Sequence, residues 1–279
     1  MTEDTQAAID GKTGISYLQR PGAGPLVMAL HGIGSNAHSF APFFDGFGGQ
    51  GHLVAWNAPG YLDSAPLAAD WPVAGDYAEA LERFADSQQI EQMILLGHSL
   101  GCLVAAAFVR RCPDRVRQLV LASPALGYQI PVGGTLPETA ENRLRELAEK
   151  GPQEFARARS ARLVHAPEKN PQLVAAVSQE MARINPSGYG QAVRMLASGD
   201  LIADLAAAAI RPGFITGLGD LVTPPEQTYR GVAALADQLG HTPPVAEIAG
   251  AGHAVYMQKP AEFLASFKKL AGLGQQALA

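Results

Sequence analysis

The stretch Gly97-His98-Ser99-Leu100-Gly101 places one serine between two glycines, where an apolar run over residues 93–96 meets a helix-like run over residues 103–110. This setting predicts a nucleophile elbow, a strand-to-helix turn in which the serine has strained backbone and its neighbours two residues away must lack bulk. The two glycines meet that requirement. We therefore expect the hydroxyl of Ser99 to project from the sheet edge as a nucleophile, the alternative being a glycine turn without a catalytic role.

The composition describes a globular protein. The chain has 279 residues, of which 47% are hydrophobic and 17% charged, which is enough for one large domain with a substantial core. The net charge of -5, without a basic cluster, argues against a nucleic-acid partner. Residues 1–10 contain acidic side chains and no apolar core, and no other apolar run is long enough for a membrane span. We expect a cytoplasmic protein with no membrane partner.

The two cysteines favour neither a disulfide nor a metal. Cys102 and Cys112 fall on the helix-like run after the serine, about 15 Å apart along its axis, which is too far for a disulfide. A buried small hydrophobe is the favoured interpretation of Cys102, with a reactive thiol as the alternative. The chain contains no H-E-x-x-H, paired C-x-x-C or helix-opening G-x-G-x-x-G motif. We expect no cofactor and no metal, and a small molecule as the substrate.

Apolar strand-like runs alternate with helix-like stretches along most of the chain. Strands are expected over residues 13–18, 26–30, 52–56, 93–96, 116–122, 212–216 and 245–248. Helices are expected near residues 38–44 and over residues 75–88, 103–110, 226–239 and 261–271. The alternation predicts an α/β fold with a mostly parallel central sheet and helices on both faces.

Between residues 123 and 205 the alternation gives way to four helix-like stretches without a convincing strand. One of them carries apolar residues at helical spacing, namely Leu173, Val177, Met181 and Ile184. We predict that residues 125–205 form an inserted helical cap on a core of residues 1–124 and 206–279. The insert follows a strand whose carboxyl end lies at the sheet edge of the serine, so we expect it to cover Ser99.

The predicted cap has consequences for the pocket beneath it. Its apolar stripes need a dry surface, so we expect a mostly apolar pocket that accepts bulky charged acyl groups poorly. Met181 and Ile184 should then influence acyl-length preference, whereas Glu180 should face solvent.

Two more polar residues follow glycine-containing strand ends downstream. Asp220 ends Gly217-Leu218-Gly219-Asp220, and His253 ends Gly250-Ala251-Gly252-His253. An imidazole can remove the proton of a serine during attack, and a carboxylate on the other ring nitrogen fixes the tautomer and stabilises the imidazolium. The chain order serine, aspartate, histidine is the order found with nucleophile elbows. A loop histidine without a catalytic role is the alternative for His253, and contact with substrate is the less favoured interpretation of His98 and His165.

These motifs, together with His31-Gly32 and Pro224, make the chain resemble the α/β-hydrolase superfamily over nearly its whole length. The resemblance implies the α/β-hydrolase fold and a triad of Ser99, His253 and Asp220. It also implies an oxyanion hole formed by the backbone N–H groups of Ile33 and Leu100. In this family the histidine at the position of His31 braces the oxyanion loop.

A serine nucleophile points to acyl chemistry. The resemblance is to enol-lactonase-type and arylesterase-type members, which implies hydrolysis of a small carboxylic ester or lactone through an acyl-enzyme. A carbon–carbon bond hydrolase acting on a ring-cleavage product is an alternative, although such relatives often carry Asn and Trp where this chain has His98 and Ala254. A cofactor-free dioxygenase, a perhydrolase and a ligand receptor on the same fold are further alternatives.

Overall fold

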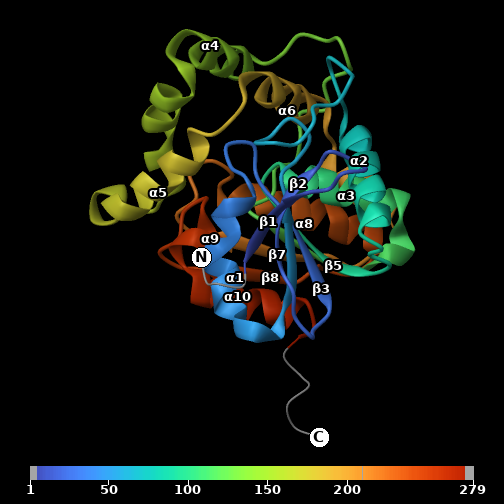
Figure 1. Cartoon of the computed structure of the whole chain (residues 1–279). Helices are drawn as coiled ribbons and strands as arrows, with labels where there is room; N and C mark the ends of the chain where they lie inside the picture. The colour runs from blue at the N-terminus through green and yellow to red at the C-terminus, as the bar shows by residue number, and fades with distance from the viewer. Residues whose placement is uncertain (1–4, 209, 274–279) are drawn as a thin grey trace, which may run out of the picture.

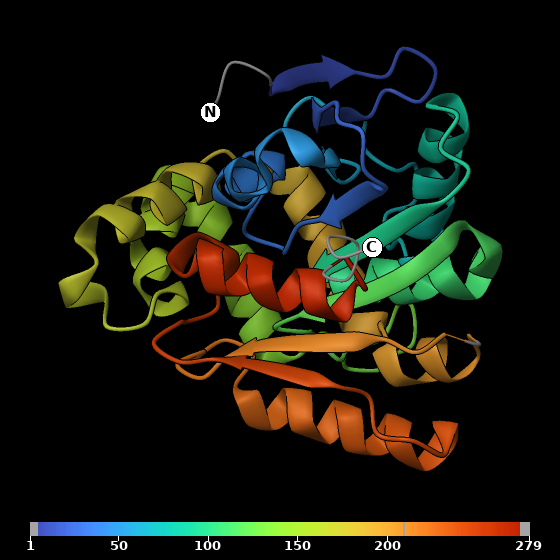
Figure 2. The same ribbon diagram turned by 90° about the horizontal axis from the view of Figure 1, so that it is seen from below.

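The computed structural model describes residues 5–208 and 210–273, and residues 1–4 of the acidic N-terminal stretch lie outside them. An eight-stranded sheet forms the centre, with helices on both faces (Figure 1 and Figure 2). The strands are β1 (Gln6–Ile9), β2 (Ser16–Arg20), β3 (Leu26–Leu30), β4 (His52–Trp56), β5 (Met93–His98), β6 (Val116–Ala122), β7 (Gly213–Gly217) and β8 (Val245–Ile248). The predicted α/β fold is confirmed.

The strand order is β1-β2-β4-β3-β5-β6-β7-β8. Strands β3 to β8 pair in parallel, and β1 and β2 add an antiparallel hairpin at one edge. Parallel strands are covered on both faces and therefore read as continuous apolar runs. This explains why the bounds predicted for β3 and β4 match the structure. The bounds predicted for β6 and β8 match as well, although both strands carry exposed residues.

The entry strand predicted over residues 13–18 is present as β2, but it begins and ends later than predicted, and it pairs with the unpredicted strand β1 in a hairpin. The carboxylate of Asp10 accepts hydrogen bonds from the backbone N–H and the hydroxyl of Thr13. These bonds hold the chain in a turn, so β2 begins only at Ser16. The side chains of β1 are mostly exposed. Its sequence therefore has no buried face that a periodicity argument could detect.

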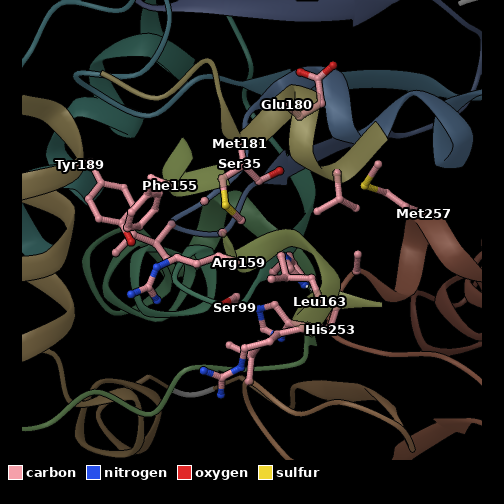
Figure 3. Close-up of a pocket in the computed structure, with 18 of the residues that line it drawn as sticks. Ser35, Ser99, Phe155, Arg159, Leu163, Glu180, Met181, Tyr189, His253 and Met257 are labelled. Atoms are coloured by element: carbon pink, nitrogen blue, oxygen red, sulfur yellow. Dashed lines mark hydrogen bonds between the residues drawn. The ribbon is translucent and has the colours of Figure 1, made fainter. Parts of the chain in front are cut away.

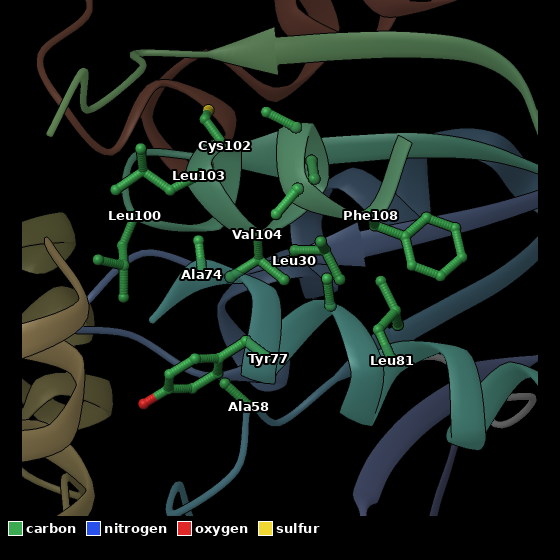
Figure 4. Close-up of a cluster of buried hydrophobic side chains, with 14 of the residues drawn as sticks. Leu30, Ala58, Ala74, Tyr77, Leu81, Leu100, Cys102, Leu103, Val104 and Phe108 are labelled. Atoms are coloured by element: carbon green, nitrogen blue, oxygen red, sulfur yellow. The ribbon is translucent and has the colours of Figure 1, made fainter. Parts of the chain in front are cut away.

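Two groups of helices cover the sheet. On one face lie α2 (Ala74–Ser87), α3 (Gly101–Arg111) and α8 (Pro225–Leu239), and on the other lie α1 (Ala41–Phe47), α9 (Val255–Gln258) and α10 (Pro260–Leu270). Figure 4 shows the packing of α2 and α3, where Tyr77 and Leu81 lie near Val104 and Phe108. Short 3-10 helices are η1 (Ala37–Phe40), η2 (Gly48–Gln50) and η3 (Pro113–Arg115). No helix in the described ranges has both the length and the apolar character of a membrane span.

The segment between β6 and β7 contains α4 (Glu138–Arg159), η4 (Ser160–Leu163), η5 (Pro167–Lys169), α5 (Pro171–Met181), α6 (Pro186–Ser198) and α7 (Leu201–Ala206). Helices α4 and α6 lie at the top of Figure 1 and α5 projects at the left, and α4 packs against both. Helix α4 is broken at Gly151, whose φ of 74° lies in the left-handed region before Pro152. Helix α7 packs against α3 and α8, so the last part of the segment lies on the sheet-covering helices.

Candidate active site

Ser99 occupies the turn between β5 and α3 with a φ of 53°, a left-handed value that is strained for a residue with a side chain. A Cβ added at Gly97 would lie 2.8 Å from the Cα of Cys102, and one added at Gly101 would lie 2.3 Å from the carbonyl oxygen of Leu30. The turn therefore requires glycine at both positions. The structure has the strand–turn–helix geometry that the pentapeptide predicts.

The loops after β7 and β8 bring Asp220 and His253 together. The Oδ2 atom of Asp220 lies 2.8 Å from Nδ1 of His253, and both side chains are buried. The Oδ1 atom accepts hydrogen bonds from the backbone N–H groups of Val222 at 2.7 Å and Thr223 at 3.0 Å. An imidazole that donates from Nδ1 to a carboxylate keeps Nε2 free as a proton acceptor.

The carboxyl group of Asp220 is ionised at neutral pH. Burial alone would raise its pKa, but the adjacent imidazole of His253 and the backbone N–H donors outweigh burial and lower the pKa to about 2. The aspartate therefore holds a negative charge against the ring throughout the neutral range.

Thr223 completes this arrangement and is absent from the sequence-based set. Its Oγ1 lies 3.0 Å from Oδ2 of Asp220, 3.0 Å from the carbonyl oxygen of Ser123 and 3.2 Å from Nδ1 of His253. Only a local sequence signal points to Thr223: in a turn, an aspartate often accepts hydrogen bonds from the backbone N–H groups two and three residues later. The contacts with Ser123 and His253 come from other loops and have no sequence signature.

Ser99 and His253 line one cavity of about 150 Å³, which lies between the carboxyl edge of the sheet and the inserted helices (Figure 3). The apolar part of the lining includes Ile33, Phe155, Leu163, Val177, Met181 and Val222. No hydrogen bond within the described residues occupies the backbone N–H of Ile33 or of Leu100. Both donors are thus available to an oxygen bound at the turn.

His31 joins two loops behind the cavity. Its Nε2 accepts a hydrogen bond from the backbone N–H of Ala58 at 3.0 Å, and its Nδ1 lies 2.8 Å from the carbonyl oxygen of Gly32. Burial lowers the pKa of His31 to about 4, which keeps the ring neutral. These contacts fit the bracing role that the resemblance implies.

His98 is buried beside His253, with ring centroids 4.8 Å apart, and it lines the cavity. Its Nε2 donates to the backbone carbonyl oxygen of His253 at 2.9 Å, whereas its Nδ1 has no partner among the described residues. Burial and the neighbouring His253 lower the pKa of His98 to about 3. His165, by contrast, is exposed and does not line the cavity.

The lining is mostly apolar, as expected, but it also includes three arginines of the insertion, namely Arg143, Arg159 and Arg162. The expectation that bulky charged acyl groups fit poorly stays a prediction. Glu180 also lines the cavity and pairs with Arg183 at 3.1 Å, so it does not simply face solvent. Long charged side chains pack their stems against apolar surface, as the guanidinium of Arg159 does 4.6 Å above the Phe155 ring.

Met181 lines the cavity as expected, whereas Ile184 is buried in the core and does not line it. Cys102 is buried and donates to the carbonyl oxygen of Gly97, and burial raises the pKa of its thiol well above the ordinary range. The interpretation of Cys102 as a small hydrophobe is confirmed.

The sheet, the strained serine turn and the aspartate–histidine pair define an α/β hydrolase. Residues 23–259 match the family model described as serine aminopeptidase, S33, and the chain belongs to that family within the α/β-hydrolase superfamily.

Three known proteins illustrate the range of its relatives. The chain is 24% identical over 231 residues to (E)-2-((N-methylformamido)methylene)succinate hydrolase of Acinetobacter baylyi, covering 81% of this chain and 82% of that protein. It is 30% identical over 151 residues to the dihydrolipoyllysine-residue acetyltransferase component of the acetoin cleaving system of Cupriavidus necator, covering 52% of this chain and only 40% of that protein. The crystal structure of the enol-lactonase from Burkholderia xenovorans superposes with a TM-score of 0.78 at 17% identity, covering 96% of this chain and 100% of that one.

Proposed function

We propose that this hydrolase cleaves a small carboxylic ester or lactone with Ser99 as its nucleophile. The observation that carries the proposal is the pairing of His253 with ionised Asp220 at 2.8 Å, with His253 and Ser99 lining the same cavity. A carboxylate, an imidazole and a serine in this relation are the parts that acyl transfer through a covalent intermediate requires.

In the proposed reaction the Oγ of Ser99 attacks the carbonyl carbon while Nε2 of His253 takes its proton. The negative charge of Asp220 stabilises the imidazolium, and the N–H groups of Ile33 and Leu100 stabilise the tetrahedral oxyanion. The imidazolium then gives its proton to the leaving alkoxide, and the acyl group remains on Ser99. Water, deprotonated by the same imidazole, releases the acid and restores the serine.

The relatives support this class of reaction. One relative is named (E)-2-((N-methylformamido)methylene)succinate hydrolase and one similar structure is that of an enol-lactonase, so hydrolysis, including that of a lactone, occurs among similar proteins. The cavity of about 150 Å³ favours a small substrate, since cavities near this volume accommodate a molecule such as benzene. We further propose that the part of residues 125–205 that lines the cavity acts as a cap, which covers Ser99.

The test is hydrolysis of p-nitrophenyl acetate by the wild type and by Ser99→Ala. We expect kcat to fall by roughly 10³-fold or more, because the variant cannot form the acyl-enzyme, while the fold persists. Ser187→Ala, which changes an exposed serine on α6, is the matched control and should keep its activity. Hydrolysis by Ser99→Ala at nearly the wild-type rate would refute the proposal.

A further inference from the structure

The cavity carries more positive than negative charge on its cap side. Arg143, Arg159 and Arg162 line it, against the single carboxylate of Glu180. That carboxylate is paired with Arg183, and Figure 3 shows it on a different side of the cavity from Phe155 and Tyr189. Among the residues of the insertion that line the cavity, arginine therefore outnumbers glutamate by three to one.

The three arginines differ in how their charge is balanced. The Nε and Nη2 atoms of Arg159 donate to Oε2 of Glu146 at 3.0 Å and 2.6 Å, so this guanidinium is already neutralised within the cap. Arg162 lies on the exposed turn η4 and has no ion pair within the described residues. Arg162 thus lines the cavity with an exposed side chain, whose charge is weakened by solvent.

Arg143 differs from Arg159, because no carboxylate of the described residues neutralises its charge. It is half-buried on α4 and contacts the buried Tyr189. Its Nε is buried and has no hydrogen-bond acceptor in the part of the chain that the structure describes. A buried donor that lacks an acceptor is costly, and a charged one more so, unless a ligand supplies the acceptor.

We propose that the substrate carries a free carboxylate apart from the bond that is cleaved, and that Arg143 binds it. This inference rests on the proposed ester or lactone hydrolysis and names its substrate class. A carboxylate accepts two parallel hydrogen bonds from one guanidinium, and its small size suits a cavity of about 150 Å³. The apolar side chains of Phe155, Leu163 and Met181 then contact the hydrocarbon part of the substrate.

The test compares ethyl hydrogen adipate with ethyl hexanoate, which share the scissile bond and the acyl chain length but differ in a terminal carboxylate. We expect kcat/KM to be at least 10-fold higher for the carboxylate ester in the wild type. Arg143→Gln should reduce this preference by about 10- to 100-fold, the range for a hydrogen bond to a charged group. Arg143→Lys, which keeps the charge but loses the planar fork, should give an intermediate preference.

Arg145→Gln is the matched control, because Arg145 lies on the same helix but is exposed and outside the lining. It should retain the full preference. Cleavage of both esters with equal kcat/KM in the wild type would overturn the carboxylate assignment while leaving the hydrolysis intact. A preference that survives Arg143→Gln would also overturn it.

Carboxylate binding can also be measured without turnover, which tests the role of Arg143 even if neither ester is cleaved. Calorimetric titration of Ser99→Ala with adipate should show binding that the double variant with Arg143→Gln loses at least 10-fold. Absence of adipate binding, equal binding by the double variant, or tighter binding of inorganic phosphate than of adipate would each overturn the assignment.

Discussion

At the scale of single residues, the three histidines of the site differ in the groups that surround them. His253 faces an ionised aspartate, whereas His31 and His98 are buried against neutral backbone groups. Burial is the main cause that lowers the pKa of His31 to about 4 and of His98 to about 3. The fold therefore keeps two neutral rings close to the pair formed by His253 and Asp220.

Because His31 and His98 are buried as neutral rings, we predict that the free energy of unfolding falls in mild acid. The unfolded chain binds a proton at each histidine below about pH 6.5, but the folded protein does so only near pH 4 for His31 and pH 3 for His98. Their contribution is thus complete above pH 6.5 and is lost as the pH falls toward those values. We expect the free energy of unfolding in urea to fall by about 2–4 kcal/mol between pH 7 and pH 5.

His98→Gln should remove about half of that pH dependence, because the glutamine does not titrate but can still donate to the His253 carbonyl oxygen. Asp220, whose pKa is lowered to about 2, titrates below this window and should not contribute to it. Equal free energies of unfolding at pH 7 and pH 5 in the wild type would contradict the assignment of neutral rings.

The sequence was sufficient to predict that Ser99, Asp220 and His253 lie at one edge of the sheet, because each follows a predicted strand and lies beside glycine in the expected chain order. Their catalytic roles stay part of the proposal. The sequence was not sufficient to locate Arg143, since an arginine on an amphipathic helix has the same pattern whether it borders a cavity or solvent. Thr223 escaped for a similar reason. Its role depends on loops that approach one another only in the folded chain.

At the scale of elements, close backbone contacts attach the insertion to the core. A Cβ added at Gly188 of α6 would lie 2.0 Å from the carbonyl oxygen of Gly60, in the loop after β4. The side chain of Gln191 donates to the carbonyl oxygens of Leu67 and Ala69 at 2.8 Å each. On the other side of the cavity, the backbone N–H of Ala254 donates to the carbonyl oxygen of Leu163 at 2.9 Å.

These contacts predict that Gly188→Ala displaces α6 from the core. The added methyl group meets backbone rather than a flexible side chain, so we expect a loss of about 1–3 kcal/mol and a lower midpoint of thermal unfolding. Gly190→Ala on the same helix is the matched control, because its methyl group would meet only the movable end of Arg194 at 3.2 Å. A Gly188→Ala variant as stable as Gly190→Ala would show that the close contact is not required.

The elements themselves were predictable where they are buried on both faces, as for β3 and β6, or strongly amphipathic, as for α2. The exposed strand β1 and the short helix α9 were missed, because neither spans enough residues to show a period. The break in α4 lies at Gly151, which has a left-handed backbone and precedes a proline. The only sequence signal for this break is the local Gly-Pro pair, because the helical pattern continues on both sides of it.

At the scale of the whole molecule, the parallel sheet collects loops from different parts of the chain at one edge. The turn after β5 supplies Ser99, and the loops after β7 and β8 supply Asp220 and His253. The loop after β3 supplies the backbone N–H of Ile33, which has no acceptor among the described residues. The segment between β6 and β7 emerges beside them and lines the cavity with α4, η4 and α5. The architecture thus gathers Ser99, the Asp220–His253 pair and the backbone N–H of Ile33 beneath an inserted segment that carries three arginines of the cavity lining.

The central claim is that Ser99 forms a covalent bond with the reacting group. The most direct measurement is the intact mass of the protein after incubation with diethyl p-nitrophenyl phosphate, followed by peptide mapping. The serine oxygen should form a bond to phosphorus and release p-nitrophenolate, leaving one diethylphosphoryl group on Ser99 in the wild type and none in Ser99→Ala. An unmodified wild type, or equal labelling of the wild type and Ser99→Ala, would contradict the account.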